Sequence, residues 1–554
     1  MGRSHDATIK IDTAAPQRVW AGARFWVANG WLPFCVLVLA IKLLLLWLDS
    51  TPKLYMGDSG SYIRTALIGS IPRDRSYFYG YLVRWLAIWP HSFTPLLVVQ
   101  ALASGATAIV FALICSRFFE MSNRLSFLFG LMCALDPCQL LWERYVMTET
   151  FSLLVYVLVL YWSLAYLRNR RLWQLAVVQA LSVLLIGFRM SYLLVVQACT
   201  ILLPLIAFAR CGLPALRNRS GARAPEAGVL TTGLTHVVAS IAMMFIMHGA
   251  YKHANGWLSH RQPAYLYDAG AHLAAVWAPA LQPSDATDSR FRDLIANGHQ
   301  FKIDDPTLRN AQHFGKGFLI DRWREIEKDR RKSDRIARET AMNALRRRPL
   351  QIAGLALRTY MGYWGIASIQ SYAREDLGGV DLTDDQVKML AQEFRFATVK
   401  RITSQPLSLL QWYFVRAWPY YFIVVVSPLL CAVATWLSRD RAFALLLFIH
   451  ASILMVVVTA LSPQACIRYL QPVSVLTLLS IAICVDWLAR RARPAAMQPT
   501  SLFCRAQGTH FEAARPEGLE PSTYGLEIRC SIRLSYGRRW WNCHRKLSKI
   551  QRGV

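Results

Sequence analysis

Ten apolar runs constrain this 554-residue chain more than any other feature, because each is close to the length that crosses a bilayer. An α-helix rises about 1.5 Å per residue, so about 20 apolar residues cross roughly 30 Å of hydrocarbon. The composition agrees with membrane spans, since 54% of the residues are hydrophobic and the mean hydropathy is +0.28. We predict an all-α polytopic membrane protein with about ten transmembrane helices, at residues 31–49, 93–116, 125–142, 150–167, 173–188, 190–209, 229–249, 412–437, 441–461 and 469–489.

The distribution of arginine among the loops predicts the orientation of these helices. Residues 1–30 have no small-residue cleavage site behind an apolar core, so the first run is predicted to be a retained helix rather than a signal peptide. If both termini are cytoplasmic, the short outer loops near 143–149, 189 and 462–468 hold one arginine each, and the inner loops hold many more. This asymmetry is the positive-inside pattern of a multi-pass protein of the plasma (inner) membrane.

Two long segments then lie outside the membrane, a first outer loop at 50–92 and an insertion at 250–411. The insertion follows a seven-span half, residues 31–249, and precedes a three-span half, residues 412–489. After it comes a basic tail, residues 490–554, which we predict to be disordered.

The insertion is predicted to be mostly helical. Mixed charges at helical spacing predict a solvated helix in 321–348 that ends before Pro349. Thr383 and Gln386 have the spacing of a capping box, which predicts the start of another helix. The apolar stretch 350–369 is interrupted by glycines and an arginine, so we predict an amphipathic helix on the outer face rather than an eleventh span.

Charge and cysteine content argue against nucleic-acid binding, a disulfide framework and a zinc site. The net charge of +28 lies largely in the inner loops and the tail, so membrane lipids rather than nucleic acid are the expected partner. The 12 cysteines fall mostly inside apolar runs and include no CxxC pair, which argues against a disulfide framework or a zinc site.

The tail contains a string of unusual character at 515–538, "RPEGLEPSTYGLEIRCSIRLSYGR". It closely resembles the product of a reading frame that crosses a transfer-RNA gene on the opposite strand. The resemblance implies that the last fifty or so residues are read-through; the alternative is an ordinary basic cytoplasmic tail.

Asp58 is the first candidate for chemistry, because it follows the first span closely in the stretch "KLYMGDSGSYI". An ionisable group near a membrane surface costs free energy unless it is solvated or paired. Gly57 and Gly60 would let the backbone approach a ligand closely or adopt a positive φ. The alternative is structural, with Asp58 or Ser59 capping the N-terminus of a helix.

A second set of acids lies in the next outer loop, where Glu143 and Glu149 precede the fourth span. Consecutive outer loops share one membrane face, so Asp58 and either of these glutamates are predicted to meet. Paired carboxylates suit a divalent cation or a division of base and electrostatic roles. Alternatively, Glu149 is simply a favourable acid at a helix N-terminus.

Arg468 and Tyr469 mark the start of the last span. A guanidinium at the outer interface suits bidentate contact with a phosphate, or it anchors the helix at the interface together with Tyr469. In the insertion, Asp268 stands among Tyr265, Tyr267 and His272, a combination that suits either a sugar pocket or a packed interfacial helix.

The sequence holds four motifs that belong together: an acid soon after the first span, the aromatic stretch "YFYGYLVRWL", a "TE" entering span four and "RYLQP" entering a late span. Together these four motifs resemble the GT-C superfamily of membrane glycosyltransferases. The likeness is nearest to the branch of protein O-mannosyltransferases and aminoarabinose transferases. It implies sugar transfer at the outer face from a polyprenyl-phosphate donor to a glycan, lipid or protein acceptor, with inversion.

Carried onto this chain, the resemblance implies that Asp58 is the base and Glu149 the second catalytic acid. It implies that Arg468, with Arg73 or Arg75, binds the donor phosphate. The substrate cavity would then be lined by Gly57, Gly60, Tyr77, Asp268 and Tyr469.

The resemblance leaves the metal open. Many family members carry an adjacent acidic pair in the first loop, whereas here Ser59 follows Asp58. A divalent cation, Mg²⁺ or Mn²⁺, held by Asp58 and Glu149 is therefore a separate prediction. Asp74, between Arg73 and Arg75, would replace the missing acid or be neutralised by the two arginines.

Two other classes of function remain alternatives. A transporter or flippase for a lipid-linked sugar would show internal repeats and ionisable residues deep in its spans. The sequence shows no repeat, and Asp136, Arg189 and Asp486 fall near the predicted ends of spans. A non-enzymatic assembly protein that binds a partner through its outer domain would make the acidic loop residues dispensable.

Overall fold

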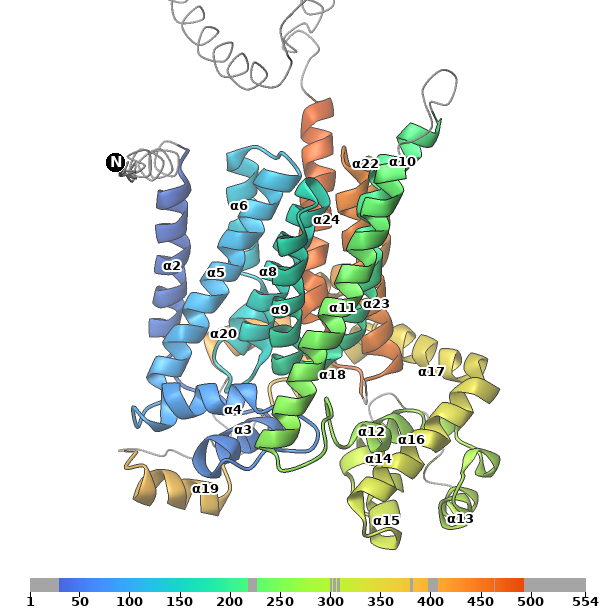
Figure 1. Cartoon of the computed structure of the whole chain (residues 1–554). Helices are drawn as coiled ribbons and strands as arrows, with labels where there is room; N and C mark the ends of the chain where they lie inside the picture. Colours follow the sequence, from blue (N-terminus) through green and yellow to red (C-terminus); the bar gives the residue numbers. More distant parts are fainter. Residues whose placement is uncertain are drawn as a thin grey trace, which may run out of the picture. The chain divides into compact units, whose positions relative to one another are not determined.

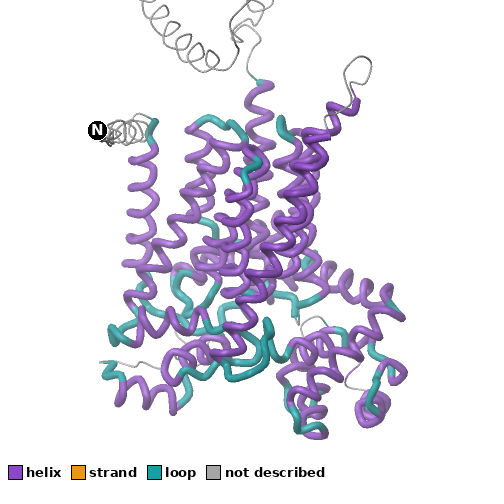
Figure 2. Tube along the Cα trace, in the orientation of Figure 1, coloured by secondary structure: helices purple, strands orange, loops and turns teal. Residues whose placement is uncertain are grey.

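Long, roughly parallel helices dominate the computed structural model of this chain (Figure 1). The structure describes residues 29–217, 227–298, 301, 305, 309–378, 382–396, 407–462 and 464–492. Within these residues the regular structure is helical, apart from a single bridge between Lys53 and Tyr145. Figure 2 shows this helical character, with most loops gathered at one end of the long helices.

Seven helices of the described chain are long and apolar enough to cross a membrane, or eight if one bent pair counts as a span. The protein is therefore a helical polytopic membrane protein by length and composition, and a count of ten is not confirmed. The seven are α2 (Trp31–Leu48), α5 (Thr94–Phe118), α8 (Glu149–Asn169), α10 (Leu193–Arg217), α11 (Ala227–Leu258), α23 (Arg441–Ala460) and α24 (Gln471–Arg491).

The third predicted span is two short helices, α6 (Asn123–Ala134) and α7 (Pro137–Trp142). Asp136 causes the break, because its carboxylate accepts a hydrogen bond from the Cys138 backbone N–H at 2.7 Å and so caps α7. Pro137 then takes the first helical position, where its missing N–H is tolerated. The fifth predicted span, α9 (Leu172–Phe188), is helical over 17 residues.

Prolines divide the eighth predicted span into three helices, α20 (Leu409–Arg416), α21 (Trp418–Val425) and α22 (Ser427–Leu437). Pro419 and Pro428 each stand in the first turn of a new helix, where no N–H donor is needed. The axes of α21 and α22 differ by 61°. This segment is thus the bent pair, a broken span or a re-entrant loop.

The first outer loop folds into α3 (Met56–Ile68), α4 (Phe78–Val83) and the π-helical turn η1 (Arg84–Ile88). Figure 1 shows α3 and α4 at the same end of the long helices as α19 (Asp384–Lys388), while the α5–α6 connection lies at the other end. Consecutive connections therefore alternate between the two ends of the bundle, as the sequence predicts for outer and inner loops.

The insertion is helical and has a core of its own. Its buried members include Trp277, Phe291 and Trp323, whereas Tyr363 and Ile369 belong to the main core of the bundle. Its last part is therefore packed into the bundle. Its helices are α12 (Ala269–Val276), α13 (Ser289–Asn297), α14 (Arg309–Phe314), α15 (Leu319–Ile326), α16 (Arg330–Arg347), α17 (Pro349–Gly362), α18 (Ile366–Glu375) and α19 (Asp384–Lys388).

Two expectations for the insertion can be compared with these helices. The helix in 321–348 is interrupted, because Asp329 caps α16 by accepting a hydrogen bond from the Arg331 N–H at 2.9 Å. The apolar stretch 350–369 contains α17 and α18, which lie outside the candidate spans, and Leu350 is 85% exposed. The predictions for residues 1–28 and for the tail after 492 fall outside the described residues.

Candidate functional site

Asp58 lies in the first turn of α3, in a helix rather than in a glycine turn. Gly57 and Gly60 are both helical, so neither adopts the positive φ that the sequence offered as one of two uses for these glycines. Ser59, not Asp58, supplies the local hydrogen bond: its hydroxyl accepts from the Tyr55 N–H at 2.8 Å and donates to the Val146 carbonyl at 3.0 Å. The Asp58 carboxylate is therefore left for other partners.

Those partners are two arginines, Arg75 from the same loop and Arg468 from the start of the last long helix. Asp58 contacts Arg75 at 2.9 Å through one carboxylate oxygen and Arg468 at 2.8 Å through the other. Arg75 also pairs with Asp74 at 2.7 Å. The Asp58 side chain is 23% exposed, so it remains reachable from one side.

Arg468 is the centre of the cluster. Its Nη1 contacts Asp58, and its Nε pairs with the carboxylate of Glu149, which is fully buried at the start of α8. Arg468 lies in the 3₁₀ turn η7 (Ile467–Leu470), immediately before α24. The structure thus brings together Asp58, Glu149 and Arg468, three of the residues to which the resemblance assigns chemistry.

The electrostatics of Asp58 limit what it can do in this state. Burial alone would raise its pKa, but the guanidinium groups of Arg75 and Arg468 outweigh that effect and lower the pKa to about 2. A carboxylate with so low a pKa is a weak base. Asp58 therefore needs to lose part of its arginine contact before it can take a proton.

Arg189 is the residue that the sequence reasoning missed. Its guanidinium lies 3.7 Å from Glu149 and 5.4 Å from the centre of the Tyr469 ring. The central carbon of the Arg468 guanidinium lies 5.7 Å from the centre of the same ring. The available signal was its position as the lone arginine of a short outer loop, the same signal that marks Arg468. Three arginines, including Arg75, thus surround Asp58 and Glu149.

Glu143 does not join Asp58, although the sequence offered it as an alternative to Glu149. It is fully buried and paired with Lys42 of α2, and it also contacts Arg144 at 3.3 Å. Lys42 is an ionisable residue inside a candidate span, which the sequence reasoning had not recognised. This group stabilises the junction of α2 with the loop between α7 and α8.

Arg73 and Asp268 form a second charged group. Asp268 pairs with Arg73 at 3.6 Å and with Arg324 at 3.0 Å. The described contacts therefore place Arg73 with the insertion, and of the two neighbouring arginines it is Arg75 that contacts Asp58. Tyr77 stacks against Phe78, with ring centres 4.7 Å apart.

The two glycines differ in their surroundings. The Gly60 carbonyl accepts a hydrogen bond from the Gln386 side chain at 2.6 Å, which ties α3 to α19. Gly57 has open space where a Cβ would stand. The prediction that these glycines line a substrate cavity stays a prediction.

The predicted cation site fits poorly with this geometry. The described residues contain no group of three or more His, Cys, Asp or Glu side chains that could hold a metal ion. Arg468 contacts both Asp58 and Glu149, so a cation bridging those carboxylates would have to displace it. The three arginines already supply positive charge beside these carboxylates.

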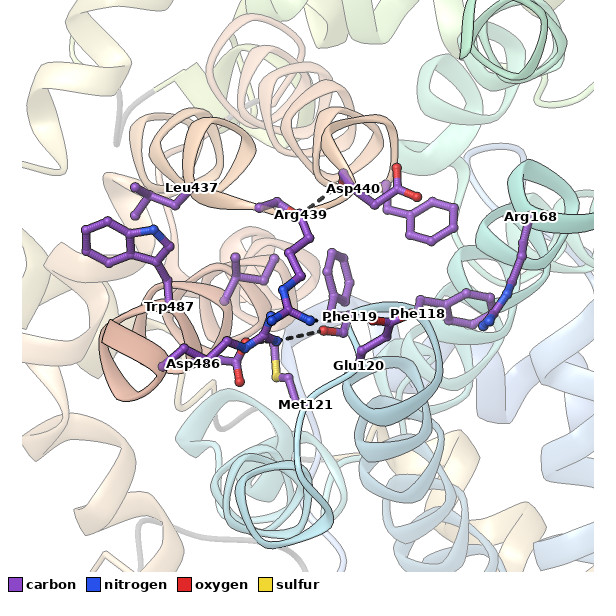
Figure 3. A pocket seen from close by; sticks show the side chains of 14 residues that line it. Phe118, Phe119, Glu120, Met121, Arg168, Leu437, Arg439, Asp440, Asp486 and Trp487 are labelled. Atoms are coloured by element: carbon purple, nitrogen blue, oxygen red, sulfur yellow. Dashed lines mark hydrogen bonds and ion pairs between the residues drawn. The ribbon is translucent and has the colours of Figure 1, made fainter. Parts of the chain in front are cut away.

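A cavity of about 320 Å³ lies at the opposite end of the bundle (Figure 3). It is lined by the ends of α5, α22 and α24. Its lining residues include an exposed ion pair between Arg439 and Glu120, with a separation of 3.7 Å between nitrogen and oxygen. The predicted site residues are not among its lining residues. It is thus separate from the Asp58 cluster.

Comparisons with models of known protein families, with curated proteins and with solved structures find no match to this chain.

Proposed function

We propose that this protein is a membrane glycosyltransferase that moves a sugar from a polyprenyl-phosphate donor to an acceptor hydroxyl. The observation that supports the proposal best is the contact of Arg468 with both Asp58 and Glu149 at the end of the bundle. Fixed guanidinium groups suit bidentate recognition of a phosphate, and a carboxylate beside them can act as the general base for the acceptor hydroxyl. Both are present among the described residues in one cluster.

The donor phosphate would compete with Asp58 for the arginines. As an anion it pairs with Arg468 and Arg75, and the Asp58 carboxylate then loses the contacts that keep its pKa at about 2. The pKa of Asp58 rises, because burial without those charges favours the protonated form. Donor binding in this way converts Asp58 from a weak base into an effective one.

The transfer is then a single displacement. The acceptor oxygen attacks the anomeric carbon while its proton passes to Asp58. The bond between that carbon and the phosphate oxygen breaks, and its electron pair remains on the lipid phosphate. The guanidinium groups of Arg468 and Arg75 stabilise the charge that develops there. An in-line attack gives inversion at the anomeric carbon.

The test measures transfer by the purified protein from polyprenyl-phosphate sugars carrying a labelled sugar. Arg468→Ala is expected to lower the rate by about 10²–10³-fold, the usual effect of removing one transition-state donor. Asp58→Asn is expected to lower it by about 10²–10⁴-fold through loss of the base. Asp293→Asn, at an exposed acid of the insertion, is the matched control. Undiminished transfer by Asp58→Asn would exclude the base assignment.

A flippase for a lipid-linked sugar is the second candidate, because Lys42 is an ionisable residue buried within α2. Movement of a labelled donor across a proteoliposome membrane, without any transfer, would favour it. Loss of that movement in Lys42→Met, with no effect of Asp58→Asn, would separate it from the transferase.

A further inference from the structure

Asp376 is a fully buried carboxylate that touches the Arg468 cluster from the insertion. It follows α18 directly, and its own N–H donates to the Tyr372 carbonyl at 2.9 Å. One of its carboxylate oxygens accepts from the Arg468 backbone N–H at 2.7 Å, and the other accepts from the Tyr55 hydroxyl at 3.3 Å. Neither its sequence position nor any motif points to this role.

The first of these contacts caps η7 from another part of the chain. The first N–H groups of a helix have no partner within it, and Cys466, which precedes η7, provides no side-chain cap. Asp376 fills this role by accepting from the backbone N–H of Arg468. Tyr363 adds a second anchor, because its hydroxyl accepts from the Cys466 N–H at 2.9 Å. The insertion therefore fixes the backbone that carries Arg468.

The second contact fixes the surface on which the Arg468 guanidinium rests. The central carbon of that guanidinium lies 4.6 Å from the centre of the Tyr55 ring. Asp376 holds the hydroxyl of the same ring. Gly378 packs closely behind, since a Cβ there would lie 2.9 Å from the Tyr55 ring. Asp376 thus holds Arg468 in place through its backbone and through its aromatic support.

We propose that Asp376 is a positioning residue for Arg468 and that its ionised form holds the arginine in the orientation that binds the donor phosphate. This inference rests on the proposed function, because it assigns regulation to the same site. Asp376 is the acceptor in both of its side-chain contacts, one from the Arg468 backbone N–H and one from the Tyr55 hydroxyl. An ionised carboxylate accepts from both, whereas a protonated one has to donate its O–H to the Tyr55 oxygen, which turns the Tyr55 hydroxyl away from its present direction.

The surroundings of Asp376 place its titration near neutrality. Burial raises its pKa to about 7, and the contact with Arg468 only partly opposes this. Among the described residues, the charged group with a resolved effect on the Asp376 carboxyl is Arg468. Tyrosines and cysteines also interact with this carboxyl electrostatically and are uncharged near neutral pH: Tyr55, Cys138, Tyr145, Tyr363, Tyr421 and Cys466.

The test measures binding of a polyprenyl methyl phosphate, a phosphodiester that has no group titrating near pH 7. Wild-type affinity is expected to rise about tenfold between pH 6 and pH 8, as the ionised fraction of Asp376 increases. Asp376→Asn is expected to bind weakly and equally at both values. Tyr55→Phe keeps the ring but removes the hydroxyl that stabilises the ionised form, so the midpoint is expected to move to higher pH.

The outcomes separate the inference from the proposed function. A wild-type pH profile that persists in Asp376→Asn would overturn the positioning role while leaving donor binding intact. A folded wild type that binds no phosphodiester at either pH would overturn the proposed function, and the inference with it. If Asp376→Asn does not fold, Tyr55→Phe decides: an unmoved midpoint refutes the role of Asp376.

Discussion

Replacing Asp58 by asparagine removes a charge that two arginines hold and leaves the size of the side chain unchanged. Although burial opposes ionisation, Arg75 and Arg468 lower the pKa of Asp58 from 3.8 to about 2. At about 1.4 kcal/mol per pKa unit, the net preference for the ionised form in the folded state is about 2 kcal/mol. Because the folded-state pKa is lowered, this stability is present above pH 3.8 and is lost as the pH falls toward 2.

The expected loss in Asp58→Asn is therefore about 2 kcal/mol of unfolding free energy at pH 7. It is smaller than the roughly 3–5 kcal/mol that follows when a buried charge loses its only partner. The reason is that each arginine keeps another carboxylate: Arg468 keeps Glu149, and Arg75 keeps Asp74.

Tryptophan fluorescence during thermal unfolding in detergent measures the effect, with Asp293→Asn as the control. Asp293 is exposed, so its variant is expected to unfold within about 0.5 kcal/mol of wild type. The difference between Asp58→Asn and wild type is expected to stay constant from pH 7 to pH 5, since Asp58 is ionised throughout. Equal stability of Asp58→Asn and the control would refute the electrostatic account of this cluster.

Three further changes probe other parts of the fold and site. Lys42→Met leaves the buried Glu143 with Arg144 as its remaining cation, so the expected loss of unfolding free energy is below the roughly 3–5 kcal/mol of a buried charge that loses its only partner. The double variant Lys42→Met/Glu143→Gln is expected to recover part of that loss, both measured by thermal unfolding. Gly80→Ala places a Cβ 2.4 Å from Thr65 Cγ2 and is expected to cost about 1–3 kcal/mol in the same assay, so wild-type stability would contradict this packing. Arg189→Gln removes one guanidinium near Glu149 and is expected to lower the rate of sugar transfer at least about tenfold. Its melting temperature is expected to fall less than that of Lys42→Met. An unchanged transfer rate would show that Arg189 is not part of the site.

Several elements of the fold were predictable because their causes are local. The length of an apolar run is enough to identify a helix such as α5 or α23, whose bounds differ from the expectation by three residues or fewer. The capping box at Thr383 is present as predicted, with the hydroxyl accepting from the Gln386 N–H. Each depends on interactions within a few residues.

The third and eighth predicted spans were wrong because the prediction followed hydropathy and ignored helix-start signals inside the apolar runs. Asp136 followed by Pro137 is a helix-start signal inside an apolar run, and it divides the third predicted span. Pro419 and Pro428 divide the eighth in the same way. A hydropathy average over about 20 residues does not register a single cap or a single missing N–H donor.

The sequence by itself determined that this chain is a helical membrane protein, and it indicated that Asp58, Glu149 and Arg468 share one end of the bundle. It did so because transfer of apolar residues into a bilayer depends on composition and length, and because successive spans alternate in direction. Only the tertiary structure decided which charges meet: that Glu143 belongs to Lys42 and that Asp376 supports Arg468. Those contacts join residues about 90 or more positions apart, and their energy depends on distances of a few ångströms that no local pattern specifies.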